Sequence, residues 1–155
     1  MEYVCELKDR PETPTICIRT RTGVENLANV VGPAFGALGG YLAQSGAQPV
    51  GAPYIAYFNM DMQDLELEIG FPLAAPVAGQ GVFEPGRLPA GQYAVTLHRG
   101  PYTNLGDAYE ALNGFLGALE RQPTGVVYEV YHNAPDEVAP EELLTEIQFP
   151  LAPET

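Results

Sequence analysis

The chain has 155 residues, a length that suits one ordinary domain with an apolar core that needs no disulfide or metal as a staple. Twenty acidic residues against seven basic ones give a formal charge of −13, which would repel the phosphate backbone of a nucleic acid. No apolar run approaches the length of a membrane span and no signal peptide is recognisable, so we expect a cytoplasmic protein with no membrane segment and no direct contact to nucleic acid.

The first half of the chain predicts a strand, a helix and a hairpin. Residues 15–22 are rich in β-branched side chains, which favours a strand. Apolar residues then recur at helical spacing over about residues 24–44, but Pro33 and several glycines interrupt them, so we expect a kinked or broken helix. Residues 54–60 and 66–71 form the predicted hairpin.

The second half predicts the same order of elements after a connecting segment. Residues 74–91 are rich in Pro, Gly and Ala and predict a loop rather than a further element. Residues 92–99 predict a strand, and Asn104 can cap a helix with apolar residues three and four positions apart. Residues 126–133 and 143–149 predict a second hairpin.

A repeated motif relates the two halves. Residues 67–73 read Leu-Glu-Ile-Gly-Phe-Pro-Leu, and residues 145–151 read Thr-Glu-Ile-Gln-Phe-Pro-Leu, with five of seven positions identical. The sequence therefore predicts a single domain, residues 1–155, of the α+β class. In it a β-α-β-β unit occurs twice, at about residues 14–73 and 92–151, related by a pseudo-twofold axis and forming an antiparallel sheet with the helices on one face.

The usual markers of metal, redox and serine chemistry are weak. Cys5 and Cys17 lack a CxxC spacing and predict core or edge packing. His98 and His132 lack metal-ligand spacing, and Ser45 lacks the context of a nucleophile elbow. We therefore expect no metal and no cofactor.

The alternation of side chains along the last strand of each copy indicates two carboxylates of interest. The Ile and Phe of the motif should face the helix, which turns Glu68 and Glu146 to the helix-free face. We expect Tyr57 and Tyr131 on that face too, so that the two halves enclose an acidic, aromatic groove suited to a planar lipophilic cation. The simpler alternative is a pair of solvated glutamates and tyrosines that only pack across strands.

Three segments together resemble the GyrI-like small-molecule-binding domains, which are related to the effector-binding domains of bacterial multidrug-sensing transcription regulators. The segments are His-Arg-Gly-Pro-Tyr at 98–102 before a helix, Val-Tyr-His-Asn at 130–133, and the motif at 145–151. The resemblance covers about residues 14–153. Relatives often carry a fused helix-turn-helix module, but the two repeats fill this chain, so it looks like a stand-alone member.

The resemblance implies a ligand groove between the halves and an acidic residue of the final strand, here Glu146, that contacts cationic ligands. Tyr131 matches the tyrosine-asparagine pattern of the preceding strand, and Tyr57 would line the opposite wall with Glu68. An aromatic residue that the family often has near the end of the second helix has no match, because the chain has no tryptophan.

Three functions follow from these expectations, of which binding is favoured. The first is the binding or sequestration of a lipophilic cationic drug or toxin. The second is hydrolysis of cyclopropane-bearing genotoxins, with Glu146 positioning or deprotonating water, although no catalytic residue is assigned firmly. The third is a protein-interaction role such as that of a gyrase-inhibitory protein.

Overall fold

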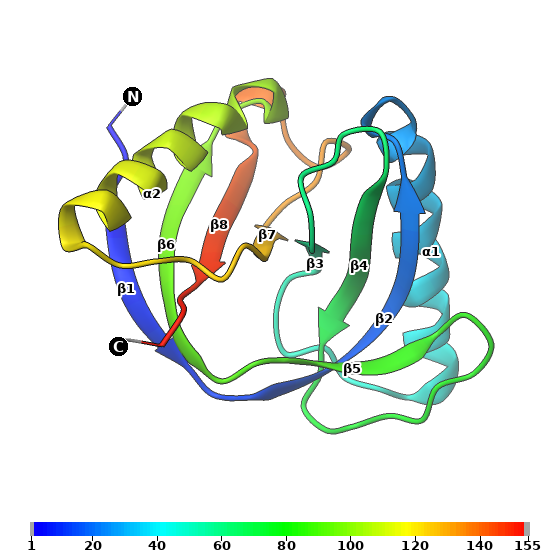
Figure 1. Cartoon of the computed structure of the whole chain (residues 1–155). Helices are drawn as coiled ribbons and strands as arrows, with labels where there is room; N and C mark the ends of the chain where they lie inside the picture. Colours follow the sequence, from blue (N-terminus) through cyan, green and yellow to red (C-terminus); the bar gives the residue numbers. More distant parts are fainter. Residues whose placement is uncertain (1, 154–155) are drawn as a thin grey trace. The chain divides into compact units, whose positions relative to one another are not determined.

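The computed structural model describes residues 2–153, which fall into two units. The first unit is Pro11–Ala90, and the second unit is made by the residues on either side of it. Each unit holds a strand, a helix and two further strands in chain order, together with one additional strand (Figure 1). The α+β class and the β-α-β-β order are confirmed.

The first unit is a four-stranded antiparallel sheet with one long helix. Its strands are ordered β3-β4-β2-β5. In chain order its elements are β2 (Thr13–Thr22), the 3-10 helix η1 (Val24–Asn26), α1 (Leu27–Ser45), β3 (Tyr54–Tyr57), β4 (Leu65–Pro72) and β5 (Glu84–Leu88).

The second unit has the same layout, although its additional strand comes from the start of the chain. Its antiparallel strands are ordered β1-β6-β8-β7. In chain order its elements are β1 (Cys5–Arg10), β6 (Gly91–Arg99), η2 (Tyr102–Asn104), α2 (Leu105–Leu119), β7 (Val127–Tyr131), η3 (Pro140–Glu142) and β8 (Leu144–Pro150).

The prediction of a plain loop over residues 74–91 is wrong, because β5 lies within it. This strand pairs with β2, from Thr13 opposite Leu88 to Cys17 opposite Glu84. The sequence of β5, Glu-Pro-Gly-Arg-Leu, contains the two residues that usually argue against a strand. An edge strand tolerates them, since one side of its backbone needs no ladder hydrogen bonds.

Of the kinked or broken first helix that the sequence predicts, the break does not occur. Helix α1 runs from Leu27 to Ser45 with Pro33 inside it. Proline removes the hydrogen bond to the carbonyl four residues earlier, that of Asn29. Both Pro33 and Asn29 lie on the exposed side of the helix, where water can serve that carbonyl.

Each helix packs on one face of its own sheet, as Figure 1 shows for α1 beside β2 and β4 and for α2 beside β6. Phe35 of α1 meets Phe71 of β4 with ring centroids 6.1 Å apart, and Tyr109 of α2 meets Phe149 of β8 at 5.8 Å. We call this side the helix face of each unit and the other side its back face. Strand alternation and register then assign every other strand residue to a face.

His98 has a structural role. Its ring is buried on the helix face, and Nε2 lies 3.1 Å from the carbonyl oxygen of Pro101. A carbonyl only accepts, so Nε2 carries the proton and Nδ1 accepts from the Tyr3 hydroxyl at 2.8 Å. These two hydrogen bonds fix the turn that leads into η2 and Tyr102.

Within the described range, no helix combines the length and apolar character that a membrane crossing requires. The expected ligand groove between the halves stays a prediction.

Candidate functional site

Glu129 is an acidic side chain on the helix face of the second unit. It is the central residue of β7 and stands directly opposite Ile147 of β8. Ile147 is fully buried, and Glu129 itself is only 7% exposed. A carboxylate in such a place is costly unless its oxygens are hydrogen-bonded.

Two tyrosine hydroxyls donate hydrogen bonds to this carboxylate. Tyr131, two positions further along β7 on the same face, donates to Oε1 at 2.6 Å. Tyr109, which projects from α2 onto the sheet, donates to Oε2. Tyr102 adds a third ring, set edge-on to Tyr131 with the centroids 5.9 Å apart. We call Tyr102, Tyr109, Glu129 and Tyr131 the acid-tyrosine cluster.

The electrostatics of this cluster favour a positive guest. Burial raises the pKa of the Tyr102 phenol, and the charge of Glu129 raises it further, so this hydroxyl stays neutral at physiological pH. The donors from Tyr109 and Tyr131 are likewise neutral groups, and the faces of all three rings carry negative quadrupole potential. A carboxylate among aromatic rings is the arrangement that attracts organic cations.

The structure separates two residues that the sequence placed together. Tyr131 stands opposite Thr145, whereas Glu146 stands opposite Val130, so Tyr131 lies on the helix face and Glu146 on the back face. Tyr57 stands opposite Leu67 and therefore lies on the helix face of the first unit. The expectation that both tyrosines share the helix-free face with the two glutamates is thus wrong, because β7 presents its acidic residue, not its apolar Val130, to the helix.

Glu146 lies on the back face of the second unit, as predicted, in the wall of a cavity of about 710 Å³. Its carboxylate accepts a hydrogen bond from the Gln148 amide at 2.7 Å and lies 3.0 Å from Nε2 of His132. A guanidinium nitrogen of Arg10 is 3.4 Å away. The side chain remains 17% exposed, and the arginine already supplies a positive charge.

Glu68 lies on the back face of the first unit and is more deeply buried. The Tyr54 hydroxyl donates to it at 2.7 Å, and Nε of Arg19 donates at 3.1 Å. Burial, then the charge of Glu68, raises the pKa of Tyr54 and also raises that of the neighbouring Cys17 thiol to about 12. The predicted packing role of Cys17 is confirmed, since the thiol is fully buried against the carbonyl of Glu84.

Sequence reasoning missed Glu129 as a candidate functional residue, although a signal was present. In the alignment of the two halves, Glu129 matches Ile55, a position that is buried in the first unit. A carboxylate that replaces a core isoleucine in one of two similar strands marks a departure from pure packing.

Comparisons with known proteins agree with this fold. The family model described as the GyrI-like small molecule binding domain matches residues 4–152. The crystal structure of the EcmrR C-terminal domain superposes with a TM-score of 0.85 at 20% identity, covering 99% of this chain and 100% of that one. In the cryo-EM structure of the EcmrR–DNA complex, the matched region is 58% of the EcmrR chain.

Two further structures share the fold at lower identity. A hydrolase from Listeria innocua has a TM-score of 0.70 at 12% identity, with 96% of this chain and 91% of that chain covered. SAV2435, solved bound to tetraphenylphosphonium, has a TM-score of 0.70 at 13% identity, with 98% and 94% covered. No match was found among curated proteins. With the family model spanning nearly the whole sequence, the chain belongs to the GyrI-like small-molecule-binding domains.

Proposed function

We propose that this domain binds lipophilic organic cations, with Glu129 as the counter-charge and the rings of Tyr102, Tyr109 and Tyr131 as the aromatic wall. The observation that carries the proposal is the buried Glu129 carboxylate, held by two neutral tyrosine hydroxyls within a group of rings. Binding energy would come mainly from burial of the apolar guest, and the carboxylate would select for positive charge.

A protein of the same fold supports this class of ligand. SAV2435 is solved with tetraphenylphosphonium, which is a lipophilic cation. For this chain the ligand class rests on the acid-tyrosine cluster itself, since the identity to SAV2435 is 13%.

The residues expected from the sequence divide into stronger and weaker candidates. Tyr131 keeps its proposed role because it contacts Glu129 directly. Glu146 and Glu68 are weaker, since each lies within 3.4 Å of an arginine nitrogen, from Arg10 and Arg19 respectively. Tyr57 stays a proposed ligand residue on the helix face of the first unit.

The test is a matched pair of substitutions, Glu129→Gln and Glu146→Gln, titrated with tetraphenylphosphonium and with a rhodamine dye by calorimetry. Glutamine keeps the size and one acceptor oxygen but removes the charge. We expect Glu129→Gln to weaken binding by about 10- to 100-fold, which corresponds to roughly 1.4–2.8 kcal/mol, and Glu146→Gln to change it by less than about threefold.

The reverse result would restore the assignment made from the sequence, with Glu146 as the charged residue. A neutral analogue, tetraphenylmethane carrying a solubilising hydroxyl group, serves as the ligand control. It should bind both variants and the parent chain alike if the carboxylate acts through charge.

A hydrolase role is the second candidate. The sequence assigns it to Glu146, and in the acid-tyrosine cluster the corresponding group would be Glu129. Each oxygen of Glu129 already accepts a hydrogen bond from a tyrosine, which leaves fewer lone pairs to take a proton from water. The geometry therefore favours binding. Incubation with a cyclopropane-bearing alkylator decides between the two, because ring-opened product in excess over protein would establish turnover.

A further inference from the structure

The loop between β3 and β4 exposes an apolar surface in the first unit. Phe58, Met60 and Met62 of this loop and Val24 of η1 have exposed fractions of 37% to 50%. The backbone N–H of Val24 donates to the carbonyl of Met62 at 2.8 Å, which joins the two segments. We call these four residues the methionine patch.

The loop that carries the patch is held in one conformation. The side-chain amide of Asn59 donates to the carbonyl of Asp64 and accepts from the N–H of Glu66, both at 3.0 Å. Phe58 N–H donates to the carbonyl of Glu66 at 3.0 Å. A partner would therefore meet an ordered surface and lose less entropy on binding.

The second unit closes its corresponding loop with the same hydrogen bonds but without methionine. Between β7 and β8, Asn133 makes the same two hydrogen bonds, to the carbonyl of Glu142 at 3.0 Å and from the N–H of Leu144 at 2.9 Å. The loop that it closes instead contains Asp136, Glu137, Glu141 and Glu142. The exposed methionines of the first unit therefore have no counterpart in the second.

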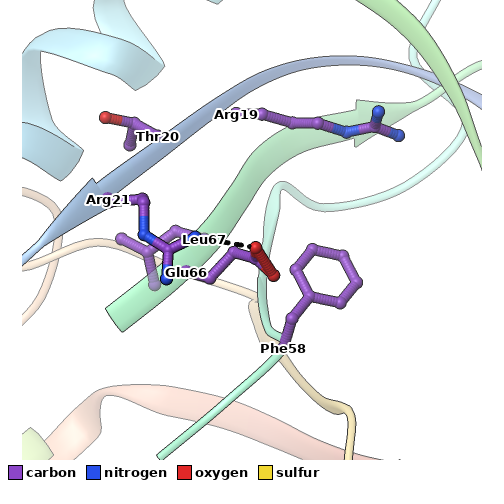
Figure 2. A pocket seen from close by; sticks show the side chains of 6 residues that line it. All are labelled: Arg19, Thr20, Arg21, Phe58, Glu66 and Leu67. Carbon is purple, nitrogen blue, oxygen red and sulfur yellow. Dashed lines mark hydrogen bonds and ion pairs between the residues drawn. The ribbon is translucent and has the colours of Figure 1, made fainter. Parts of the chain in front are cut away.

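A cavity adjoins the patch on the back face of the first unit. It has a volume of about 490 Å³ and is lined by Arg19, Thr20, Arg21, Phe58, Glu66 and Leu67 (Figure 2). Arg21 is already engaged by Glu66 at 3.0 Å and by Asp64 at 3.1 Å. Both arginines of the lining are paired with carboxylates, Arg19 with Glu68 and Arg21 with Asp64 and Glu66. The exposed Glu25 and Asp61 directly adjoin patch residues in the sequence, so the rim of the patch is acidic.

We propose that the methionine patch and this cavity bind a basic amphipathic helix of a protein partner. Methionine, aromatic residues and arginine are enriched at interfaces, and the flexible thioether side chain adapts to varied apolar shapes. The acidic rim complements lysine and arginine on the polar side of such a helix. The apolar face of such a helix would pack on the four exposed apolar side chains of the patch.

The probe is a peptide of about 18 residues made of leucine and lysine, with the leucines at helical spacing on one face. The full chain is labelled with 13C at the methionine methyl groups, which gives three signals, from Met1, Met60 and Met62. We expect the signals of Met60 and Met62 to shift on titration and that of Met1 to stay in place. The double substitution Met60→Gln with Met62→Gln should weaken binding by about 10-fold.

Two controls separate the patch from simple charge attraction. Val50 and Val82 are more exposed apolar residues of the same unit, and replacing both with glutamine should leave the affinity unchanged. A scrambled peptide of the same composition, with leucines all round the helix, should bind at least about 10-fold more weakly.

Equal binding of the two peptides, equal losses in the two double variants, or no binding at all would each overturn the proposal. Sedimentation of the free protein supplies a last check. Self-association that the methionine substitutions abolish would assign the patch to a second copy of the chain and would overturn the proposal as well.

Discussion

The helix faces of the two units differ in the residue at the same place in β3 and β7, an isoleucine in one and a glutamate in the other. Ile55 stands opposite Ile69 in the first unit, and Glu129 stands opposite Ile147 in the second. Ile55 is part of the apolar core, whereas Glu129 accepts hydrogen bonds from two tyrosine hydroxyls. One scaffold thus carries a plain apolar core in one unit and a buried, hydrogen-bonded carboxyl group in the other.

The back faces differ in how each motif glutamate is neutralised. Arg19 stands directly opposite Glu68 on the neighbouring strand, whereas Leu97 occupies that place opposite Glu146. The Glu146 carboxylate instead contacts the guanidinium of Arg10 on β1 and the ring of His132, which directly follows β7. The same Glu-Ile-x-Phe-Pro-Leu motif therefore has a buried, tightly held carboxylate in one unit and a partly exposed one in the other.

The largest expected effect comes from giving the first unit the carboxylate of the second. Ile55→Glu should lower the free energy of unfolding by about 3–5 kcal/mol, because a buried charge without prepared partners is expensive. Burial raises the pKa of such a carboxyl in the folded state, so the loss should be small in acid, grow as the pH rises above the ordinary glutamate pKa, and level off above the raised pKa. Urea denaturation at several pH values measures both.

Ile55→Val is the matched control for this position and should cost about 0.5–1.5 kcal/mol with no pH dependence. A pH-independent loss in Ile55→Glu equal to that of the valine variant would show that the position accepts charge. The distinction between the two helix faces would then fail.

A smaller effect should separate the two motif glutamates. Glu68→Gln should lower the free energy of unfolding by about 2 kcal/mol, and Glu146→Gln by less than about 1 kcal/mol. The difference follows from burial, since the Glu68 side chain is 4% exposed and that of Glu146 is 17% exposed. Arg19 is half exposed, so solvent screening limits the larger figure. Equal losses would contradict the contrast between the back faces.

The smallest effect concerns the two cysteines, one in each unit. With a pKa near 12 and a fully buried sulfur, Cys17 should not react with a thiol reagent at about pH 8, whereas the partly exposed Cys5 should. Mass spectrometry before and after denaturation counts the modified thiols. Labelling of Cys17 in the native protein would indicate that β5 opens from the first unit.

The strands and helices with regular patterns could be predicted from the sequence. Apolar alternation identified β4 and β8 and placed Glu68 and Glu146 on the back faces. Strand β5 could not be found in this way, because its pairing with β2 overrides the local preferences of Pro85 and Gly86. Strand β1 was not predicted either. Its charged sequence gives no local strand signal, and the strand forms by pairing with β6.

The candidate site was predicted in kind but not in position. An acidic, aromatic arrangement was expected, and Tyr131 belongs to it, yet the carboxylate at its centre is Glu129. The inference failed because it assumed that the helix covers only the apolar side of β7. A buried acidic residue such as Glu129 breaks the usual packing rule, so a pattern of hydrophobicity assigns it to the wrong face of the strand.

The additional strand of the second unit has a consequence for the order in which the chain folds. The first unit is continuous in sequence, but β1 must wait for β6, since Cys5 pairs with Thr96. Closing so long a loop is slow compared with folding the chain that lies within it. During synthesis the first unit can therefore form while β1 is still an unpaired strand, and the charges of Glu6, Lys8, Asp9 and Arg10 discourage that strand from joining another molecule.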